Sequence, residues 1–202
     1  IFGSLVREYT DLFVAYVYAV LHSPSFRVKY KQQLSIDFPR IPMTSDRVLA
    51  SSLATIGAQL VALHLGEAPV QQALSVRFDE SAPAWFYEVA DGQCLPVALT
   101  FVGPAEPAIE KVSWSDDTVW LDRAQTRGFQ GVPEDVWQFH IGGYQVCEKW
   151  LKDRKGRTLS AEDITHYHRI VIALYETIRL MREIDLVIDE HGGWPDAFAG
   201  KS

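Results

Sequence analysis

The strongest constraint on the fold of this chain is a stripe of apolar residues near its C-terminus. Residues three or four positions apart lie on the same face of an α-helix. Seven apolar side chains follow this spacing: Ile164, Tyr167, Val171, Leu174, Ile178, Met181 and Ile184. Ser160 and Asp163 form a start resembling a capping box for this helix. Because one face of so long a helix has to be buried, the sequence predicts a core helix that begins after Ser160.

Two helices are predicted near the N-terminus. Residues 12–21 are apolar on every face, which is typical of a core helix. Ser23 and Pro24 indicate the start of the second helix, with serine as the N-cap and proline at the first helical position. The segment Asp37-Phe38-Pro39 indicates its end, because a residue before proline avoids the helical conformation.

A third helix should begin at Thr44 or Ser45 and end at Gly66. Its apolar residues again recur every three or four positions: Leu49, Leu53, Ile56, Leu60 and Leu63. Further helical signals lie at residues 133–135 and 144–154. The sequence therefore predicts about five to six helices.

The middle third has a different pattern. Short β-prone runs alternate there with Gly, Pro and Asp: Leu74–Phe78, Val97–Val102, Lys111–Trp114 and Thr118–Leu121. Ser115-Asp116-Asp117 is typical of a hairpin turn. We therefore expect an α+β protein, with a helical frame around a small antiparallel sheet in the middle third.

The expected organisation is one compact domain with four parts. These parts are an N-terminal helical segment (1–66), a small β-rich subdomain (67–130), C-terminal helices (131–191) and an irregular tail (192–202). A length of 202 residues suits such a domain. Its first residue is Ile1 rather than methionine, so we expect a piece of a longer protein.

Composition limits the cellular setting. Cys94 and Cys147 provide neither a disulfide framework nor four metal ligands, which favours a reducing cytoplasm. The longest apolar run has ten residues, half of what a membrane span needs, and nothing resembles a secretory signal. We therefore expect a cytoplasmic protein with no membrane partner.

Positive charge is concentrated in two segments of a chain whose net charge is −7. Residues 149–157 contain five basic side chains and one acid, and residues 25–40 contain four basic side chains and one acid. Residues 67–122 contain ten acids and only two basic residues. A clustered positive charge suits a phosphate backbone. Solvated basic residues at the end of a helix that stops at Gly156 remain an equal alternative for residues 149–157.

Several motifs resemble the C-terminal part of Type ISP restriction-modification enzymes. These are single-chain proteins that carry a nuclease, a helicase-like ATPase, an adenine methyltransferase and a DNA target recognition domain. The matching segments are 139–146 (FHIGGYQV), 149–157 (KWLKDRKGR), 166–167 with 169–171, 129–133 (FQGVP) with 136–137, 16–24 (YVYAVLHSP) and 37–42 (DFPRIP). The resemblance covers nearly the whole chain and is weakest between Gly66 and Asp122. It implies that residues 1–66 follow a methyltransferase core.

The motifs of catalysis are missing from the sequence. Adenine methylation needs a glycine-rich cofactor loop and an Asn/Asp-Pro-Pro-aromatic tetrapeptide, and ATP hydrolysis needs a phosphate-binding loop. None of these occurs. His166 and His168 are two positions apart, unsuitable for zinc on a helix, so we expect solvated or capping histidines. Asp135 with Asp153-Arg154-Lys155 weakly resembles a magnesium nuclease, but on helices rather than strands. We therefore expect no catalytic residues, no cofactor and no metal.

The resemblance implies a sequence-specific domain for double-stranded DNA, which positions the methyltransferase domain of its parent chain. Candidates for phosphate contacts are Arg27, Lys29, Lys31, Lys149, Lys152, Lys155 and Arg157, and candidates for base contacts are Arg123, Gln125, Arg127, Gln145 and Arg154. The alternative is a protein-interaction or scaffolding module whose basic segments contact other domains of the parent chain.

Overall fold

The computed structural model describes residues 2–67, 74–79, 84–89 and 99–199. The chain forms two compact units, which we call the helical unit (1–68 with 176–202) and the sheet unit (69–175). Helix α8 (Ala161–Glu190) contributes its first part to the sheet unit and the remainder to the helical unit. No helix in the described part of the chain is long and apolar enough to cross a membrane.

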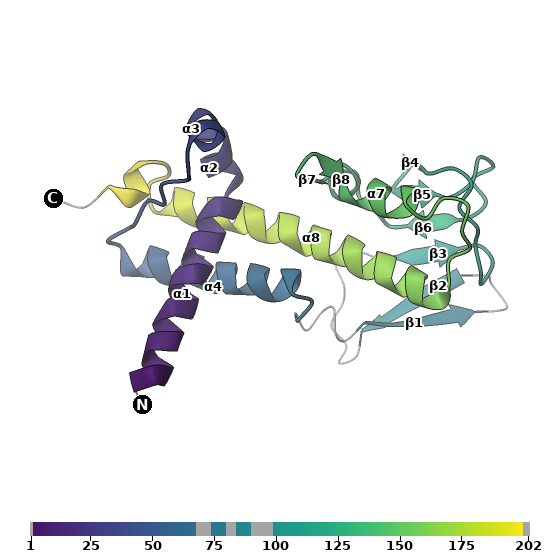
Figure 1. Cartoon of the computed structure of the whole chain (residues 1–202), viewed down its shortest axis with the longest axis horizontal. Helices are drawn as coiled ribbons and strands as arrows, with labels where there is room; N and C mark the ends of the chain where they lie inside the picture. Colours follow the sequence, from purple (N-terminus) through teal and green to yellow (C-terminus); the bar gives the residue numbers. More distant parts are fainter. Residues whose placement is uncertain (1, 68–73, 80–83, 90–98, 200–202) are drawn as a thin grey trace. The chain divides into compact units, whose positions relative to one another are not determined.

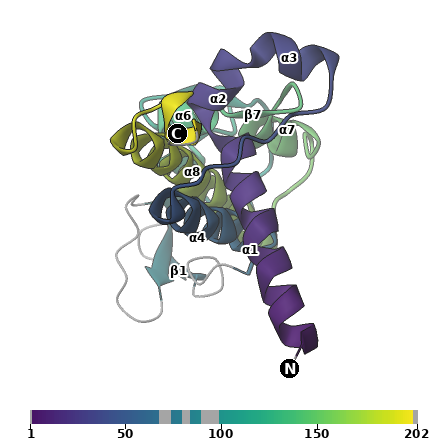
Figure 2. The ribbon, with the colours of Figure 1, turned by 90° about the vertical axis from the view of Figure 1, so that its left-hand side faces the viewer.

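The helical unit is built around the pair α1 (Phe2–His22) and α4 (Arg47–His64), which pack against each other in Figures 1 and 2. They approach closely at Gly57, where an added Cβ would lie 1.9 Å from the carbonyl oxygen of Ala15. The predicted apolar face of α4 is confirmed, because all of its members are buried: Leu49, Leu53, Ile56, Leu60 and Leu63.

The predicted second helix is interrupted at Tyr30. It consists of α2 (Pro24–Lys29) and α3 (Lys31–Ile36), and the Tyr30 ring packs against Phe26 and Trp194 with centroid distances of 4.9 and 6.1 Å. Its predicted start is confirmed, since the Ser23 hydroxyl accepts the Phe26 N–H at 3.0 Å. This interruption gives seven α-helices in the described part of the chain, one more than the upper end of the prediction.

The cap of α4 corrects a prediction. Asp46, rather than Thr44 or Ser45, accepts the N–H groups of Val48 and Leu49. Thr44 instead donates its hydroxyl to the Ala197 carbonyl at 2.9 Å and accepts the Asp46 N–H, so a partner distant in sequence decides the position of the cap. The C-terminal tail beyond α8 is largely turns, with a short 3-10 helix η1 (Asp196–Phe198).

The predicted stop of α4 at Gly66 is confirmed. Gly66 has φ +74°, and the N–H groups of Gly66 and Glu67 bond to the carbonyls of Leu63 and Ala62. This pattern is the Schellman motif, in which glycine takes the left-handed position at no steric cost.

The expectation that residues 12–21 form a helix is confirmed, but their burial on all faces is wrong. Leu12, Phe13 and Val14 are about half exposed, whereas Tyr16 and Val20 are buried. Apolar composition gave no sign of this difference, because it does not show which turns of a helix lie beside a partner.

The sheet unit contains a six-stranded antiparallel sheet with the strand order β1-β2-β3-β6-β5-β4. The strands are β1 (Leu74–Asp79), β2 (Ala84–Val89), β3 (Thr100–Val102), β4 (Ser113–Ser115), β5 (Thr118–Trp120) and β6 (Gly128–Gln130). The α+β class and the small antiparallel sheet in the middle third are therefore confirmed. Strands β2 and β6 were not predicted. The turn between β4 and β5 was predicted, and Asp116 and Asp117 adopt φ values of 50° and 52° there.

The first part of α8 packs against this sheet. Phe129 of β6 lies opposite Phe101 of β3, and the Phe129 ring is 4.3 Å from the ring of Tyr167 on α8. The reciprocal cap at Ser160 and Asp163 is confirmed, with donor–acceptor distances of 3.1–3.2 Å. His168 is fully buried beside Phe129, which corrects the expectation of a solvated or capping histidine.

A small hairpin links the sheet to α8. It follows α6 (Glu134–Trp137) and consists of β7 (His140–Ile141) and β8 (Tyr144–Gln145), and α7 (Val146–Lys152) comes next. The helix that was predicted to begin at residue 144 therefore begins two residues later, at Val146. Gly142 and Gly143 have φ values of 57° and 86°, so they form a tight turn that pairs residues 144–145 with β7.

Candidate nucleic-acid interface

The basic segment 149–157 starts on α7 and continues into a turn that ends beyond Gly156, whose φ is 79°. On α7, Lys149 pairs with Asp153, and the Lys152 ammonium lies 2.9 Å from the Glu148 carboxylate. Exposed pairs with this spacing contribute roughly 0.3–0.5 kcal/mol each, so both lysines can exchange these carboxylates for phosphates.

Arg154 is held by the protein itself. Its guanidinium carbon lies 3.6 Å from the centroid of the Trp150 ring, and its Nη1 donates to the Trp150 carbonyl at 3.1 Å. Its Nε lies 3.7 Å from a carboxylate oxygen of Asp163. These three contacts fix the turn that follows α7, which makes Arg154 a support for its neighbours.

Lys155 and Arg157 are the exposed cations of this turn. Within the described part of the chain, no hydrogen bond or ion pair engages the side chain of either residue. Their backbone is fixed instead, because Gly156 N–H donates to the Ile109 carbonyl at 3.0 Å and Ile109 N–H donates to the Arg157 carbonyl at 3.1 Å. Two free cations on a fixed backbone suit contacts with phosphates.

A loop from Asp122 to Gly128 carries three of the candidate base readers. The buried Asp122 carboxylate accepts the Thr126 hydroxyl at 2.6 Å and the backbone N–H groups of Thr126 and Arg127. Leu121 N–H closes the base of the loop by donating to the Arg127 carbonyl at 3.0 Å. Burial acts to raise the pKa of Asp122, but the hydrogen bonds from Thr126 and Arg127 outweigh it and lower the pKa. The carboxylate therefore acts as an internal clamp for the loop.

The three candidates on this loop differ in exposure. The side chain of Arg123 is 79% exposed and that of Arg127 only 25%, and both face the Glu110 carboxylate at 3.5 and 4.0 Å. Gln125 is exposed with φ 55°, and its amide nitrogen lies 3.4 Å from the Ser115 hydroxyl. The exposed pair Arg123 and Gln125 is thus accessible to a ligand.

Sequence reasoning missed the residues that shape this loop. Asp122 and Glu110 were counted only among the ten acids of residues 67–122. The signal for Asp122 was an acid followed four positions later by threonine, a pattern in which the side chain can satisfy the backbone of a turn. Glu110 gives no local signal, because it approaches the loop from a segment more than ten residues away.

The loop and the basic turn are joined through one segment of backbone. Ile109 bonds to Gly156 and Arg157, and the next residue, Glu110, donates its N–H to the Leu121 carbonyl at 2.8 Å. The structure therefore brings the cations of the turn and the residues of the loop together within the sheet unit. Gln145 is engaged elsewhere, since its amide nitrogen donates to the Trp137 carbonyl.

The other basic candidates belong to the helical unit. Arg27 Nε donates to the Leu21 carbonyl at 2.6 Å, and Lys29 donates to the Trp194 carbonyl at 3.0 Å. Burial lowers the pKa of the Arg27 guanidinium, although it stays charged. Lys31 is exposed. These residues thus form a second basic region, which belongs to the helical unit.

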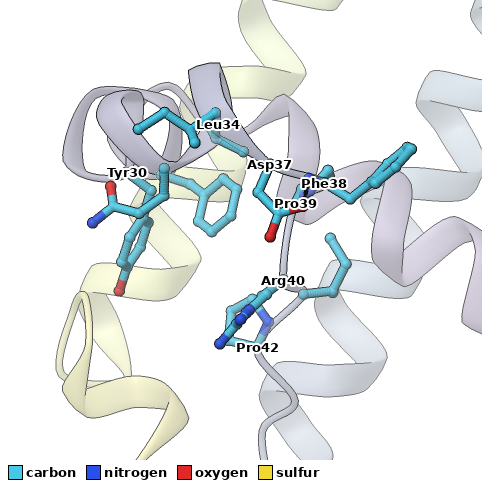
Figure 3. A pocket seen from close by; sticks show the side chains of 11 residues that line it. Tyr30, Leu34, Asp37, Phe38, Pro39, Arg40 and Pro42 are labelled. Carbon is cyan, nitrogen blue, oxygen red and sulfur yellow. Dashed lines mark hydrogen bonds between the residues drawn. The ribbon is translucent and has the colours of Figure 1, made fainter.

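A cavity of about 510 Å³ lies beside this second basic region, between α2–α3 and the segment that follows them (Figure 3). Its wall is mostly apolar, with Gln33, Asp37 and Arg40 as its polar groups. Asp37 already accepts the Phe38 N–H at 2.7 Å. Figure 3 shows Arg40 on the side of the cavity opposite α2 and α3. The cavity is large enough for a small organic group, and the guanidinium of Arg40 can pair with an anion there.

The weak resemblance to a nuclease finds no support in the geometry. Asp135 accepts the N–H of its neighbour Val136 at 2.9 Å, and Asp153 pairs with Lys149 on α7. Over residues 2–67, 74–79, 84–89 and 99–199, no three His, Cys, Asp or Glu side chains are placed to hold a metal ion. Burial raises the pKa of the Cys147 thiol to about 12, as in a buried apolar position.

An α+β domain with a clamped loop beside free cations is the kind of protein that can bind an extended anionic ligand. The sequence matches the Type ISP C-terminal specificity domain over residues 8–183, so the chain belongs to this family. The resemblance found in the sequence is thereby confirmed, and the chain is a specificity domain of restriction-modification enzymes.

Solved structures of this class are similar to the chain at low identity. The first is the ATP-dependent Type ISP restriction-modification enzyme LlaBIII bound to DNA, with 18% identity and a TM-score of 0.49 over 88% of this chain and 11% of that chain. The second is a nuclease-deletion mutant of the Type ISP enzyme LlaGI in complex with a DNA substrate mimic, with 20% identity and a TM-score of 0.48 over 89% of this chain and 13% of that chain. The third is a DrdV–DNA complex, with 21% identity and a TM-score of 0.49 over 89% of this chain and 18% of that chain. The chain thus spans less than a fifth of each. No curated protein matches the sequence.

Proposed function

We propose that this specificity domain binds double-stranded DNA, reads a target sequence, and positions a neighbouring adenine methyltransferase domain of its parent chain. The observation that carries this proposal is the clamped Asp122–Gly128 loop, which is joined through Ile109 and Glu110 to the turn bearing Lys155 and Arg157. A fixed loop with exposed polar tips costs little entropy on binding, which favours discrimination between similar ligands.

The two parts of this surface have different roles. Lysines and arginines on the basic segment bind phosphates, which fix the position of the protein but do not distinguish sequences: Lys149, Lys152, Lys155 and Arg157. Arg123 and Gln125 read base edges, because arginine suits guanine and glutamine suits adenine in the major groove. Arg127 supports the loop, since it is mostly covered and faces Glu110.

The domain performs no chemistry of its own in this proposal. It uses no cofactor or metal, and methylation and cleavage belong to other parts of the parent chain. It acts in the cytoplasm, where thiols stay reduced.

A protein-interaction role is the second candidate, and one observation favours it. Leu12, Phe13 and Val14 are exposed on α1, and adjacent exposed apolar side chains often mark a contact with another domain. This contact and DNA binding can coexist. Phe13→Glu should weaken the association with the methyltransferase domain, measured by co-purification of the two parts, while DNA affinity stays unchanged.

The test of DNA reading starts from duplexes that the 202-residue chain selects from a randomised pool. Affinity for a selected duplex and for a scrambled duplex is then measured at several salt concentrations. Lys155→Ala and Arg157→Ala should each lower the slope of log affinity against log salt by about 0.9 on both duplexes. Arg47→Ala, which removes an exposed cation from α4, serves as the matched control and should leave the slope unchanged.

Base reading is tested with the same pair of duplexes. Arg123→Ala and Gln125→Ala should cost about 1–3 kcal/mol on the selected duplex and little on the scrambled one. Equal losses on both duplexes would contradict the role of the loop. An affinity indifferent to salt would contradict the phosphate contacts as well, and with them the proposed function.

A further inference from the structure

The hairpin β7–β8 ends in a tip with open space around its turn. Its turn consists of Gly142 and Gly143, and a Cβ added at either glycine would meet no atom within 4 Å. The base of the hairpin is anchored, because Val146 N–H donates to the Phe139 carbonyl at 3.2 Å and Gln145 donates to the Trp137 carbonyl. The tip is therefore an open turn on a fixed support.

Two large apolar side chains flank the glycine turn. Ile141 and Tyr144 are paired across the hairpin, and they are 58% and 63% exposed. Their exposure has no structural reason, since the buried side of the hairpin is secured through Gln145. Neighbouring exposed apolar residues of this size mark a contact surface.

One cation beside the tip favours an anionic partner. The Lys149 ammonium lies 5.9 Å from the centroid of the Tyr144 ring, and the rest of the basic segment continues along the chain from there. An apolar tip with a cation beside it matches duplex DNA, whose phosphates border grooves that expose base edges and whose base faces become accessible when a step is unstacked. An apolar protein surface would not require this cation.

We propose that Ile141 is a wedge that this hairpin inserts between two adjacent base pairs of the bound duplex, with Tyr144 against the groove wall. The inference rests on the proposed function and deepens it, because it assigns a distortion of the DNA to a particular side chain. The major groove admits a two-stranded ribbon. Isoleucine is among the apolar residues that minor-groove proteins insert between base steps. The two glycines allow the backbone to approach the DNA closely, since they carry no side chain.

The experiment uses 2-aminopurine, a fluorescent base that is quenched when stacked and bright when unstacked. It is placed in turn at each purine of a duplex selected by the 202-residue chain, and fluorescence is read at saturating protein. We expect a rise confined to one base step. The 202 residues used in the assay contain neither the cofactor loop nor the tetrapeptide of adenine methylation, so base flipping for methylation does not produce the signal.

Variants assign the signal to the side chain. Ile141→Ala should lose the rise and return the fluorescence to that of the free duplex, whereas Ile141→Leu should retain it. Lys155→Ala should need more protein to saturate but give the same rise. Leu186→Ala, which shortens an equally exposed apolar residue of α8, should change nothing. Urea unfolding of Ile141→Ala should match the unsubstituted chain, because Ile141 is exposed.

The outcomes separate the wedge from DNA binding itself. A duplex that is bound without a rise at any position, or a rise that persists in Ile141→Ala, would overturn the wedge and leave the proposed function intact. Loss of cognate binding by Ile141→Ala without any rise in the unsubstituted complex would point to simple groove contact and would also overturn it. Failure of the unsubstituted chain to bind any duplex would overturn both.

Discussion

Replacing Asp122 with alanine should loosen the loop that carries Arg123 and Gln125. The substitution removes the acceptor for the Thr126 hydroxyl and for two backbone N–H groups, and it leaves the closing bond between Leu121 and Arg127 as the main restraint. We expect a lower free energy of unfolding and a loss of discrimination between selected and scrambled duplexes. Binding to the scrambled duplex should persist, because Lys155 and Arg157 stay in place.

The magnitude follows from the three donors that Asp122 satisfies. A hydrogen bond to a charged group contributes about 1.5–3 kcal/mol, but the loop is exposed, so water replaces part of what is lost. The expected decrease in unfolding free energy is about 3 kcal/mol for Asp122→Ala. It is about 1 kcal/mol for Asp122→Asn, which keeps one acceptor oxygen for the two backbone N–H groups, loses the charge assistance and replaces the other oxygen with an amide nitrogen that can donate to the Thr126 hydroxyl.

The pH dependence of this contribution has a definite sign. The pKa of Asp122 is lowered on folding from an ordinary value of 3.8. As the pH falls, the unfolded chain takes up the proton first, so the contribution is present above about pH 4 and is lost as the pH falls through the folded pKa.

Urea unfolding and duplex affinities measured on the same samples provide the assay. Asp117→Asn is the matched control, because it removes one negative charge from an exposed turn residue whose φ of 52° asparagine tolerates. It should change the unfolding free energy by less than about 0.5 kcal/mol. If Asp122→Ala unfolded like the control, or kept full discrimination, the clamp would not organise the loop.

Three further predictions concern other parts of the sheet unit. Burial lowers the pKa of His168 well below 6.5, so just below pH 6.5 only the unfolded chain gains this proton. The free energy of unfolding should therefore fall by about 1.4 kcal/mol per pH unit because of this residue. His168→Leu should remove that part of the pH dependence, measured by urea unfolding at several pH values. Arg154→Lys keeps the charge but loses the stack on Trp150, and should cost about 1 kcal/mol in urea unfolding; unchanged stability with weaker DNA binding would place Arg154 on the DNA instead. The chain should not nick plasmid DNA with magnesium, and nicking abolished by Asp153→Ala would assign it to the nucleases.

Local signals predicted much of the helical structure. The reciprocal cap of Ser160 and Asp163 and the start of α2 at Ser23 depend on residues within one turn, and both were confirmed. The Gly66 stop was confirmed for the same reason. Such features can be recognised because donor and acceptor are close in sequence.

Features that depend on distant partners could not be predicted. Strand β6 contains Gly128, which is unfavourable in a strand, yet an added Cβ there would lie 2.5 Å from the Val119 carbonyl, so only glycine fits beside β5. The exposure of Leu12 and the burial of His168 likewise depend on what packs nearby.

The candidate site was predicted only in part. The basic segment was visible as a cluster of charge, but the sequence did not distinguish the anchored Arg154 from the free Lys155. Arg123, Gln125 and Arg127 were candidates from the sequence, whereas the clamp of their loop and its link through Glu110 were not predicted. Which of these side chains touch bases stays a prediction.

The Asp122–Gly128 loop is held largely through its backbone, and this has a consequence for how such domains can diversify. Its closing bonds use the Asp122 carboxylate, the Thr126 hydroxyl and main-chain groups at residues 121, 126 and 127. None of them uses the side chains at positions 123 and 124, and these bonds require at position 125 only a residue that tolerates a positive φ. Under the proposed function, side chains can therefore be exchanged at these three positions while the closing bonds stay unaltered, so that one scaffold would host many target preferences through few substitutions.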